Sequence, residues 1–248
     1  MNLKTQRDFA KVFTLQLWNF KTLKLKMIKD NLSKIRKSIP ENVTLVAVSK
    51  TKPIVDLQEA YNAGQRIFGE NKIQEMVDKY DVLPKDIKWH MIGHLQSNKV
   101  KYMAHFVDLI HGVDKFKTLK EINKQAKKHH RVINCLLQVK IAKEETKFGF
   151  SFNEIEDILT SKEILELKNI KIVGFMGMAT FTDNTTQLEE EFSSLKEFFD
   201  KHRTQTITAN CKLQTLSMGM SGDYKLAIEK GSSMIRVGSA IFGNRNYN

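Results

Sequence analysis

The chain has 248 residues, of which 41% are hydrophobic, so it is long enough for one large domain or two small ones around a buried core. Its net charge of +12 is compatible with a nucleic-acid partner or an acidic membrane surface. No stretch approaches the roughly 18 apolar residues of a membrane-spanning helix, so no membrane association is expected.

The cysteines indicate where in the cell the protein lies, and the lack of linkers indicates its number of domains. Cys135 and Cys211 form neither a CxxC pair nor a disulfide framework, which indicates a reducing, cytoplasmic location. The chain has only 3 prolines and no low-complexity tract. We therefore expect a single domain over residues 28–248.

Residues 1–27 are expected to lie outside that domain. Asn19 and Lys21 interrupt their apolar residues and no small-residue cleavage site follows, which argues against a secretory signal. Three interpretations stay open: an N-terminal helical extension, a transit peptide, or a start site placed too early, with Met27 as the true first residue.

Short apolar or β-branched runs alternate with helical patterns along the domain. The runs occupy residues 44–49, 65–69, 87–93, 108–112, 133–141, 170–179, 213–218 and 234–238. Stretches between them, such as IVDLQEAYNAG and QLEEEFSSLKEFFDKH, place apolar residues at i, i+3 and i+4. This alternation predicts βαβ units, and so many strands in about 200 residues predict closure as a (β/α)8 TIM-type barrel. An open doubly wound sheet is the alternative, although its GxGxxG motif does not follow the first run.

The densest basic stretch covers residues 115–131. Its apolar residues Phe116, Leu119, Ile122 and Ala126 fall at helical spacing, so its lysines are expected to form the solvated face of an outer helix. No aromatic residues alternate with these charges and no nucleic-acid-binding signature accompanies them. We therefore expect no nucleic-acid partner.

A lysine follows the first predicted strand. Lys50 comes after the apolar residues 45–48, and Pro53 prevents the strand from continuing. Functional groups of a barrel gather at the C-terminal ends of its strands, where loss of water favours a neutral amine that can attack a carbonyl and form an imine. The alternative is a lysine that ends a strand and extends to solvent. Lys52 is expected to be a solvated or rim charge rather than a second anchor.

Small and hydroxylated residues follow the last two predicted strands. LSMGMSGD contains Ser217 and Ser221 and precedes the apolar helix YKLAIEKG, and IRVGSAIFG contains Gly238 and Ser239. Backbone N–H groups at a helix start, with hydroxyls nearby, favour phosphate, and barrels often bind phosphate in these two loops. Either stretch alone could be an ordinary turn.

An arginine interrupts the last predicted strand. Arg236 lies among apolar residues in MIRVG, where an unpaired charge would be costly. It either pairs with a carboxylate of a neighbouring strand or faces the barrel mouth and donates to a ligand. A phosphate site, an arginine and an imine-forming lysine at one rim match pyridoxal 5'-phosphate, which carries a phosphate, a ring nitrogen and an aldehyde.

These residues lie in motifs that resemble a known family, the pyridoxal phosphate homeostasis proteins, also described as YggS-like or proline synthetase co-transcribed homologue proteins. The resemblance covers about residues 28–246 and rests on VAVSKTKP, FGENKIQE, WHMIGHLQSNK, GFMGMAT and LSMGMSGDYKLAIEKGSSMIRVGSAIFGNR. Members are single barrels of the fold type III group, related to the N-terminal domain of alanine racemase. The resemblance therefore implies the same barrel here.

The resemblance also implies roles for matching positions. Lys50 would form the Schiff base and Arg236 would face the pyridine nitrogen. Positions expected around the phosphate are Ser217, Ser221, Gly238 and Ser239, and those expected along the ring are Val48, Asn71 and Met176. Residues expected near the mouth without assigned roles are His90, His94, Gln96 and Asn98. No metal site is expected, because the i,i+4 spacing of the two histidines suits a metal only on a helix.

The predicted arginine bears on the kind of chemistry. A guanidinium can only donate, so it should keep the pyridine nitrogen unprotonated and make the ring a weak electron sink. Racemases of this fold add a second acid/base from another domain, for which the sequence offers no room after Arg236. The sequence thus predicts a monomer that carries, buffers or delivers pyridoxal phosphate, with apo forms of dependent enzymes as recipients. An amino-acid racemase or related lyase and a basic nucleic-acid-binding barrel are the alternatives.

Overall fold

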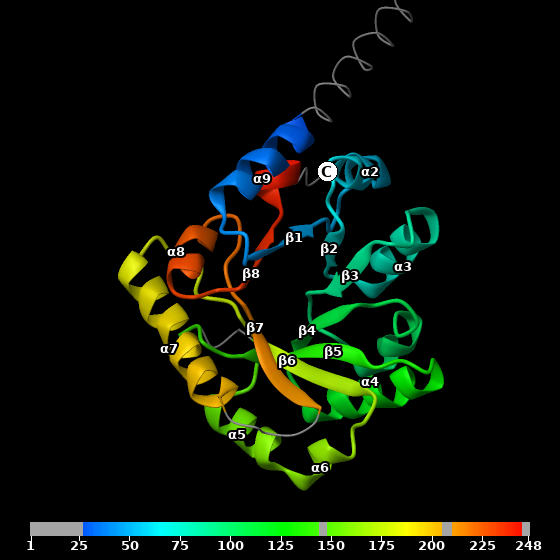
Figure 1. The fold of residues 1–248 in the computed structure, drawn as a ribbon, viewed down its shortest axis with the longest axis vertical. Coiled ribbons are helices and arrows are strands. Elements are labelled where there is room, and N and C mark those ends of the chain that lie inside the picture. Colours follow the sequence, from blue (N-terminus) through cyan, green and yellow to red (C-terminus); the bar gives the residue numbers. More distant parts are fainter. Residues whose placement is uncertain (1–26, 144–147, 205–209, 245–248) are drawn as a thin grey trace, which may run out of the picture.

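The computed structural model describes residues 27–143, 148–204 and 210–244 of the chain. Its parallel strands pair in sequence order and close into a barrel, because the last strand pairs back onto the first (Figure 1). The strands are β1 (Thr44–Val48), β2 (Ile67–Glu70), β3 (Lys88–Met91), β4 (Leu109–Val113), β5 (Ile133–Val139), β6 (Ile170–Gly177), β7 (Cys211–Ser217) and β8 (Met234–Val237).

Helices connect successive strands and surround the barrel (Figure 1). A helix over residues 27–38 precedes β1. The helices that follow are α2 (Ile54–Asn62), α3 (Ile73–Val82), the 3-10 helix η1 (Ser97–Tyr102), α4 (Phe116–Lys128), α5 (Phe152–Thr160), α6 (Lys162–Leu165), α7 (Thr185–Arg203), α8 (Tyr224–Glu229) and α9 (Ser239–Phe242).

The hydrophobic core has two layers because side chains alternate between the faces of each strand. Outward-facing residues such as Phe68, Trp89 and Phe175 pack against the helices in one large cluster. A separate, smaller cluster lies inside the barrel and consists of Val46, Leu109, Leu136, Met176 and Met234. The barrel interior also holds buried polar side chains, among them His90, His111 and Ser217.

The predicted (β/α)8 barrel is confirmed, and the open doubly wound alternative is wrong. The basic stretch forms α4, with Leu119, Ile122 and Ala126 buried and its lysines exposed, as predicted. The expected N-terminal extension falls on residues that lie outside the described ones, up to residue 26. Within the described residues no helix has the length and apolar character that crossing a bilayer requires.

Candidate functional site

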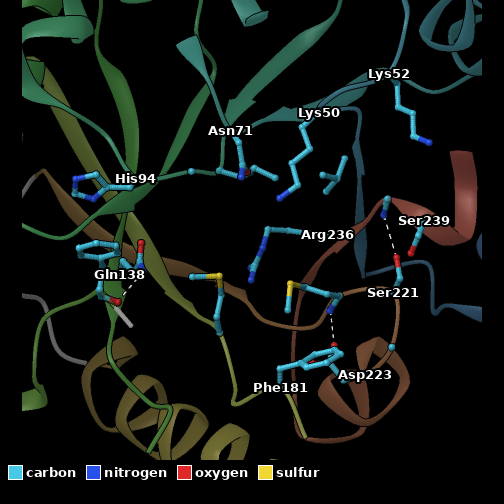
Figure 2. A pocket seen from close by; sticks show the side chains of 18 of the residues that line it. Lys50, Lys52, Asn71, His94, Gln138, Phe181, Ser221, Asp223, Arg236 and Ser239 are labelled. Atoms are coloured by element: carbon cyan, nitrogen blue, oxygen red, sulfur yellow. Dashed lines mark hydrogen bonds between the residues drawn. The ribbon is translucent and has the colours of Figure 1, made fainter. Parts of the chain in front are cut away.

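A cavity of about 470 Å³ opens at the C-terminal ends of the strands. Figure 2 shows Lys50, just after β1, and Arg236, on the neighbouring strand β8, extending into this space, with Ser221 and Ser239 at one side. The lining includes most of the residues predicted from the sequence, namely Val48, Lys50, Asn71, Ser221, Arg236, Gly238 and Ser239. The fold therefore brings the predicted lysine, arginine and serine-rich turns into one cavity.

The backbone on both sides of Lys50 is tied to β2 and α3. Ser49 donates its N–H to Gly69 O at 3.0 Å and its hydroxyl to Glu70 Oε1 at 2.6 Å. Thr51, whose φ of 63° lies in the left-handed region, donates its N–H to Glu75 Oε1 at 2.5 Å. Because the flanking residues are fixed, the side chain of Lys50 leaves the end of β1 in a defined direction, into the cavity.

A buried ion cluster underlies that arrangement. The ammonium of Lys79, on α3, donates to Glu70 Oε1 at 2.8 Å, to Glu75 Oε1 at 2.7 Å and to the Ser49 carbonyl at 2.8 Å. The side chain of Lys79 is 5% exposed and that of Glu70 is fully buried, so the charges are compensated by each other rather than by water. Burial raises the pKa of Glu70 to about 7 despite the opposing effect of Lys79.

The raised pKa of Glu70 predicts a pH-dependent stability. A carboxyl with a higher pKa in the folded than in the unfolded chain binds its proton more tightly when folded, so its contribution to stability falls as the pH rises from 4.5 towards about 7. The expected loss is about 3 kcal/mol. We expect Glu70→Gln to flatten the plot of unfolding free energy against pH over this window, measured by urea denaturation. Glu163→Gln, at an exposed ion pair, should leave the parent slope unchanged; an equally steep slope in Glu70→Gln would contradict the prediction.

Asn71 reaches the cavity because the ends of β2 and β3 approach each other closely. A Cβ on Gly93 would lie 2.5 Å from the carbonyl oxygen of Asn71, so only glycine fits at this position. Both residues line the cavity, and Asn71 also borders a second cavity of about 320 Å³.

The turns after β7 and β8 meet at Ser221. Its hydroxyl accepts a hydrogen bond from the N–H group of Gly238 at 3.1 Å (Figure 2) and another from that of Ala240 at 3.5 Å. A Cβ on Gly238 would lie 3.1 Å from Val48 O, which explains the small residue where β8 leaves the barrel beside β1. The hydroxyl of Ser221 accepts these bonds and keeps its own proton to donate, and Ser239 lines the same side of the cavity, so this side offers hydroxyl donors suited to the oxygens of an anion.

Arg236 is almost fully buried and held by β6 and β7. Its Nη1 donates to the Ser217 carbonyl at 2.9 Å and to Ser217 Oγ at 2.6 Å, and its Nη2 donates to the Gly177 carbonyl at 3.0 Å. Burial lowers the pKa of Arg236 to about 10, and the charge of Asp223 opposes this shift. The guanidinium is therefore charged near neutral pH. Its partners are mostly backbone carbonyls, so the neighbouring-strand carboxylate considered from the sequence is not its hydrogen-bond partner among the described residues.

Two predicted residues lie elsewhere. Ser217, expected at the phosphate, is fully buried below the cavity and binds Arg236 instead. Met176, expected along the ring, belongs to the apolar cluster inside the barrel. Met178, two residues further on and therefore on the same face of the chain, lines the cavity in its place. Both differences arise because the predicted positions are still within the strands, beneath the rim.

Several lining residues were not predicted as ligand-binding residues. Lys52, expected as a solvated or rim charge, lines the cavity and donates to the carbonyls of Phe242, Gly243 and Asn244 at 2.9–3.2 Å, so it ties the β1–α2 loop to the end of α9. Others include Gln138, Phe181 and Asp223. The alternation of β5 gives Gln138 an inward position in an apolar run, which is a signal that the sequence offers; Phe181 and Asp223 lie in loops without such a pattern.

The histidine motif after β3 divides between two places. His94 lines the cavity, where its Nδ1 is hydrogen-bonded to Asp114 Oδ2 at 2.9 Å and its ring stacks on Phe148. Gln96 borders the second cavity. His90 is buried inside the barrel. Asn98 is exposed on η1 and lines neither cavity.

The matching family and relatives agree with this fold. The family described as alanine racemase, N-terminal domain, matches residues 23–246. A pyridoxal phosphate homeostasis protein of Pasteurella multocida is 37% identical over 233 residues, which cover 89% of this chain and 98% of the relative. The protein of the same name from Escherichia coli K12 is 34% identical, with 89% and 97% covered.

Solved structures of known proteins have the same fold. The structure of PipY of Synechococcus elongatus PCC7942 with PLP bound superposes with a TM-score of 0.78 at 33% identity, covering 87% of this chain and all of PipY. Alanine racemase of E. faecalis superposes with a TM-score of 0.72 at 15% identity over 58% of its own length, which shows the shared barrel alone. This chain therefore belongs to the alanine racemase N-terminal domain family and, within it, to the pyridoxal phosphate homeostasis proteins.

Proposed function

We propose that this protein binds pyridoxal 5'-phosphate in the cavity above β1 and β8, and that it stores and delivers the cofactor within pyridoxal phosphate homeostasis. The observation that carries the proposal is the convergence of Lys50, Arg236 and the Ser221 turn on one cavity of about 470 Å³. Relatives that share this fold are named for pyridoxal phosphate homeostasis, and PipY has been solved with PLP bound.

The donor set fits the three functional groups of the cofactor. The hydroxyls of Ser221 and Ser239 suit the phosphate as donors, and Arg236 suits the ring nitrogen, which accepts a hydrogen bond. Lys50 is the amine in reach of an aldehyde in the same cavity. The neutral amine of Lys50 adds to the aldehyde carbon, the carbonyl oxygen leaves as water, and a Schiff base joins protein and cofactor.

The arrangement favours retention of the cofactor over turnover. Pyridoxal phosphate supplies an electron sink when bound, and a donor-only guanidinium at its ring nitrogen weakens that sink. Other titratable side chains at the cavity already have partners, His94 with Asp114 and Asp223 with the N–H of Met220. Hydrolysis of the Schiff base at Lys50 would return free pyridoxal phosphate and the free amine, which is the reversible chemistry that delivery to another apo enzyme needs.

Cofactor transfer separates this proposal from an enzyme of the same fold. The protein is loaded with pyridoxal phosphate, freed of excess ligand and mixed with an apo enzyme that depends on the cofactor, while amino-acid stereochemistry is followed in a parallel sample. We expect activity of the recipient to appear and L- and D-amino acids to stay unconverted. A protein that takes up no pyridoxal phosphate would refute the proposal, and efficient racemisation would establish the enzyme alternative.

Ser221 provides a test of the phosphate position. We expect Ser221→Ala to raise the dissociation constant for pyridoxal phosphate about tenfold or more, because a hydrogen bond to a charged oxygen is lost. Binding is measured by the change in absorbance on titration. Ser233→Ala removes a serine hydroxyl that binds Leu216 away from the cavity and is the matched control. Equal affinities of the two variants would place the phosphate elsewhere.

A further inference from the structure

A row of polar side chains crosses the barrel interior beneath the cavity, where barrels normally carry branched apolar residues. The row consists of His90 on β3, His111 on β4, Ser217 on β7 and Arg236 on β8, each 4% exposed or less. Burial of polar groups is costly unless each is hydrogen-bonded. The site described above uses Arg236 of this row, and it leaves both histidines without a function.

Hydrogen bonds join these side chains end to end. Arg236 Nη1 lies 2.6 Å from Ser217 Oγ, and Ser217 Oγ lies 3.2 Å from His111 Nδ1. His111 Nε2 lies 3.0 Å from His90 Nδ1, and His90 Nε2 lies 3.5 Å from Asp108 Oδ2. Asp108 directly precedes β4 and its side chain is 43% exposed, so the row runs from the cavity to the N-terminal end of the barrel.

The chemistry of the groups fixes the direction of every bond in the row. A guanidinium can only donate, so Ser217 Oγ accepts from Arg236 and its own proton is available for His111 Nδ1. A neutral imidazole that accepts at Nδ1 carries its proton on Nε2, and His111 therefore donates to His90 Nδ1. By the same rule His90 donates from Nε2 to the carboxylate of Asp108. One proton arrangement satisfies all members, with a cation at one end and an anion at the other.

Both histidines are neutral in this arrangement. Burial lowers the pKa of His90 and lowers that of His111 well below its usual value, and the charge of Arg236 acts on His111 in the same direction. A second proton on His111 Nδ1 would face the hydroxyl proton of Ser217. The pKa of Asp108 is lowered, first of all by its hydrogen bond with His90, so the carboxylate end stays an acceptor.

We propose that Ser217, His111 and His90 are positioning residues for Arg236: the row fixes the guanidinium plane and directs its remaining N–H groups to the ring nitrogen of bound pyridoxal phosphate. Of the five N–H groups of an arginine, three donate to Ser217 and Gly177. The other two are the groups that the proposal assigns to the ring nitrogen, and Arg236 lines the cavity that would hold it. The inference rests on the proposed function for the ligand alone; the row itself exists without it.

The hydrogen-bond directions in the row can be tested without cofactor, because they determine which ring nitrogen of His90 and His111 carries the proton. Nitrogen chemical shifts of the histidine rings, assigned with His90→Gln and His111→Asn, should show the proton on Nε2 of both rings from pH 6 to pH 8. A proton on Nδ1 of either ring, or a charged ring, would overturn the inference. This readout uses the unmodified protein, so poor folding of an assignment variant does not decide the outcome.

The effect on Arg236 is measured with pyridoxal phosphate labelled with nitrogen-15 in its ring. We expect Ser217→Ala to shift the ring-nitrogen resonance and to raise the dissociation constant about three- to tenfold, because Arg236 loses one hydrogen bond. Leu109→Ile alters the barrel interior two residues before His111 and should leave both values as in the parent. An unshifted resonance in Ser217→Ala overturns the inference even where the cofactor binds normally, whereas loss of binding by the parent protein refutes the proposed function instead.

Discussion

Replacing Lys50 with alanine is expected to abolish covalent capture of pyridoxal phosphate. The parent protein mixed with the cofactor should turn yellow, and borohydride should fix the cofactor to Lys50, because reduction converts the imine to a stable secondary amine. In Lys50→Ala the covalent label should fall to background, measured by the intact mass and by peptide mapping. Weaker, non-covalent binding should persist, since the hydroxyls of Ser221 and Ser239 and the guanidinium of Arg236 are unchanged at the cavity.

Lys52→Gln is the matched control for Lys50→Ala. Lys52 lines the same cavity from the same loop, but its ammonium is bonded to the carbonyls of Phe242, Gly243 and Asn244. The label should stay on Lys50 in this variant. The protein should lose some stability, because the bonds from Lys52 to the carbonyls at the end of α9 are lost. A label that moved to Lys52 in Lys50→Ala would reveal two competent amines, and one that persisted at full yield on another residue would contradict the proposed role of Lys50.

The sequence predicts the barrel well because the fold depends on local patterns. Each strand is a short apolar run and each helix has an amphipathic period, so the order of elements follows from hydrophobicity alone. Parallel closure then gathers the strand ends, which explains why the sequence alone predicts Lys50, Asn71, Ser221 and Arg236 at one rim. The resemblance to known motifs adds a prediction of which of these residues would meet which group of the cofactor.

Depth within the barrel is what the sequence does not predict. Ser217 and Ser221 lie in the same short stretch, yet the first is inside the barrel under Arg236 and the second is at the rim. Met176 and Met178 differ in the same way. The height at which a strand ends depends on its register with both neighbours, and β6 and β7 contain a register shift near Gly174 that a one-dimensional pattern cannot reveal.

The buried cluster around Lys79 was equally hidden, because its members come from different elements. Ser49 follows β1, Glu70 ends β2, and Lys79 and Glu75 lie one turn apart on α3. In the sequence Lys79 reads as one more solvated charge of an amphipathic helix. In the fold it is the donor that connects α3 to the residue before Lys50.

Lys79→Met is expected to be the most destabilising of the substitutions considered. Removing one member of a buried ion pair typically costs about 3–5 kcal/mol, because the remaining charge is left without compensation. The variant should lose about this much unfolding free energy in urea at pH 8, where Glu70 is ionised in the parent. Lys201→Met, at an exposed pair with Glu156, should cost about 1 kcal/mol or less and serves as the surface control.

The pH dependence identifies the cause of that loss. Without Lys79, the pKa of Glu70 should rise above its value of about 7, so protonation can neutralise the buried carboxyl. The cost of Lys79→Met should therefore shrink as the pH is lowered to about 5, and Lys79→Met combined with Glu70→Gln should be more stable at pH 8 than Lys79→Met alone. A loss that is the same at both pH values, and is not reduced in the double variant, would assign the role of Lys79 to packing or to its bond with the Ser49 carbonyl instead.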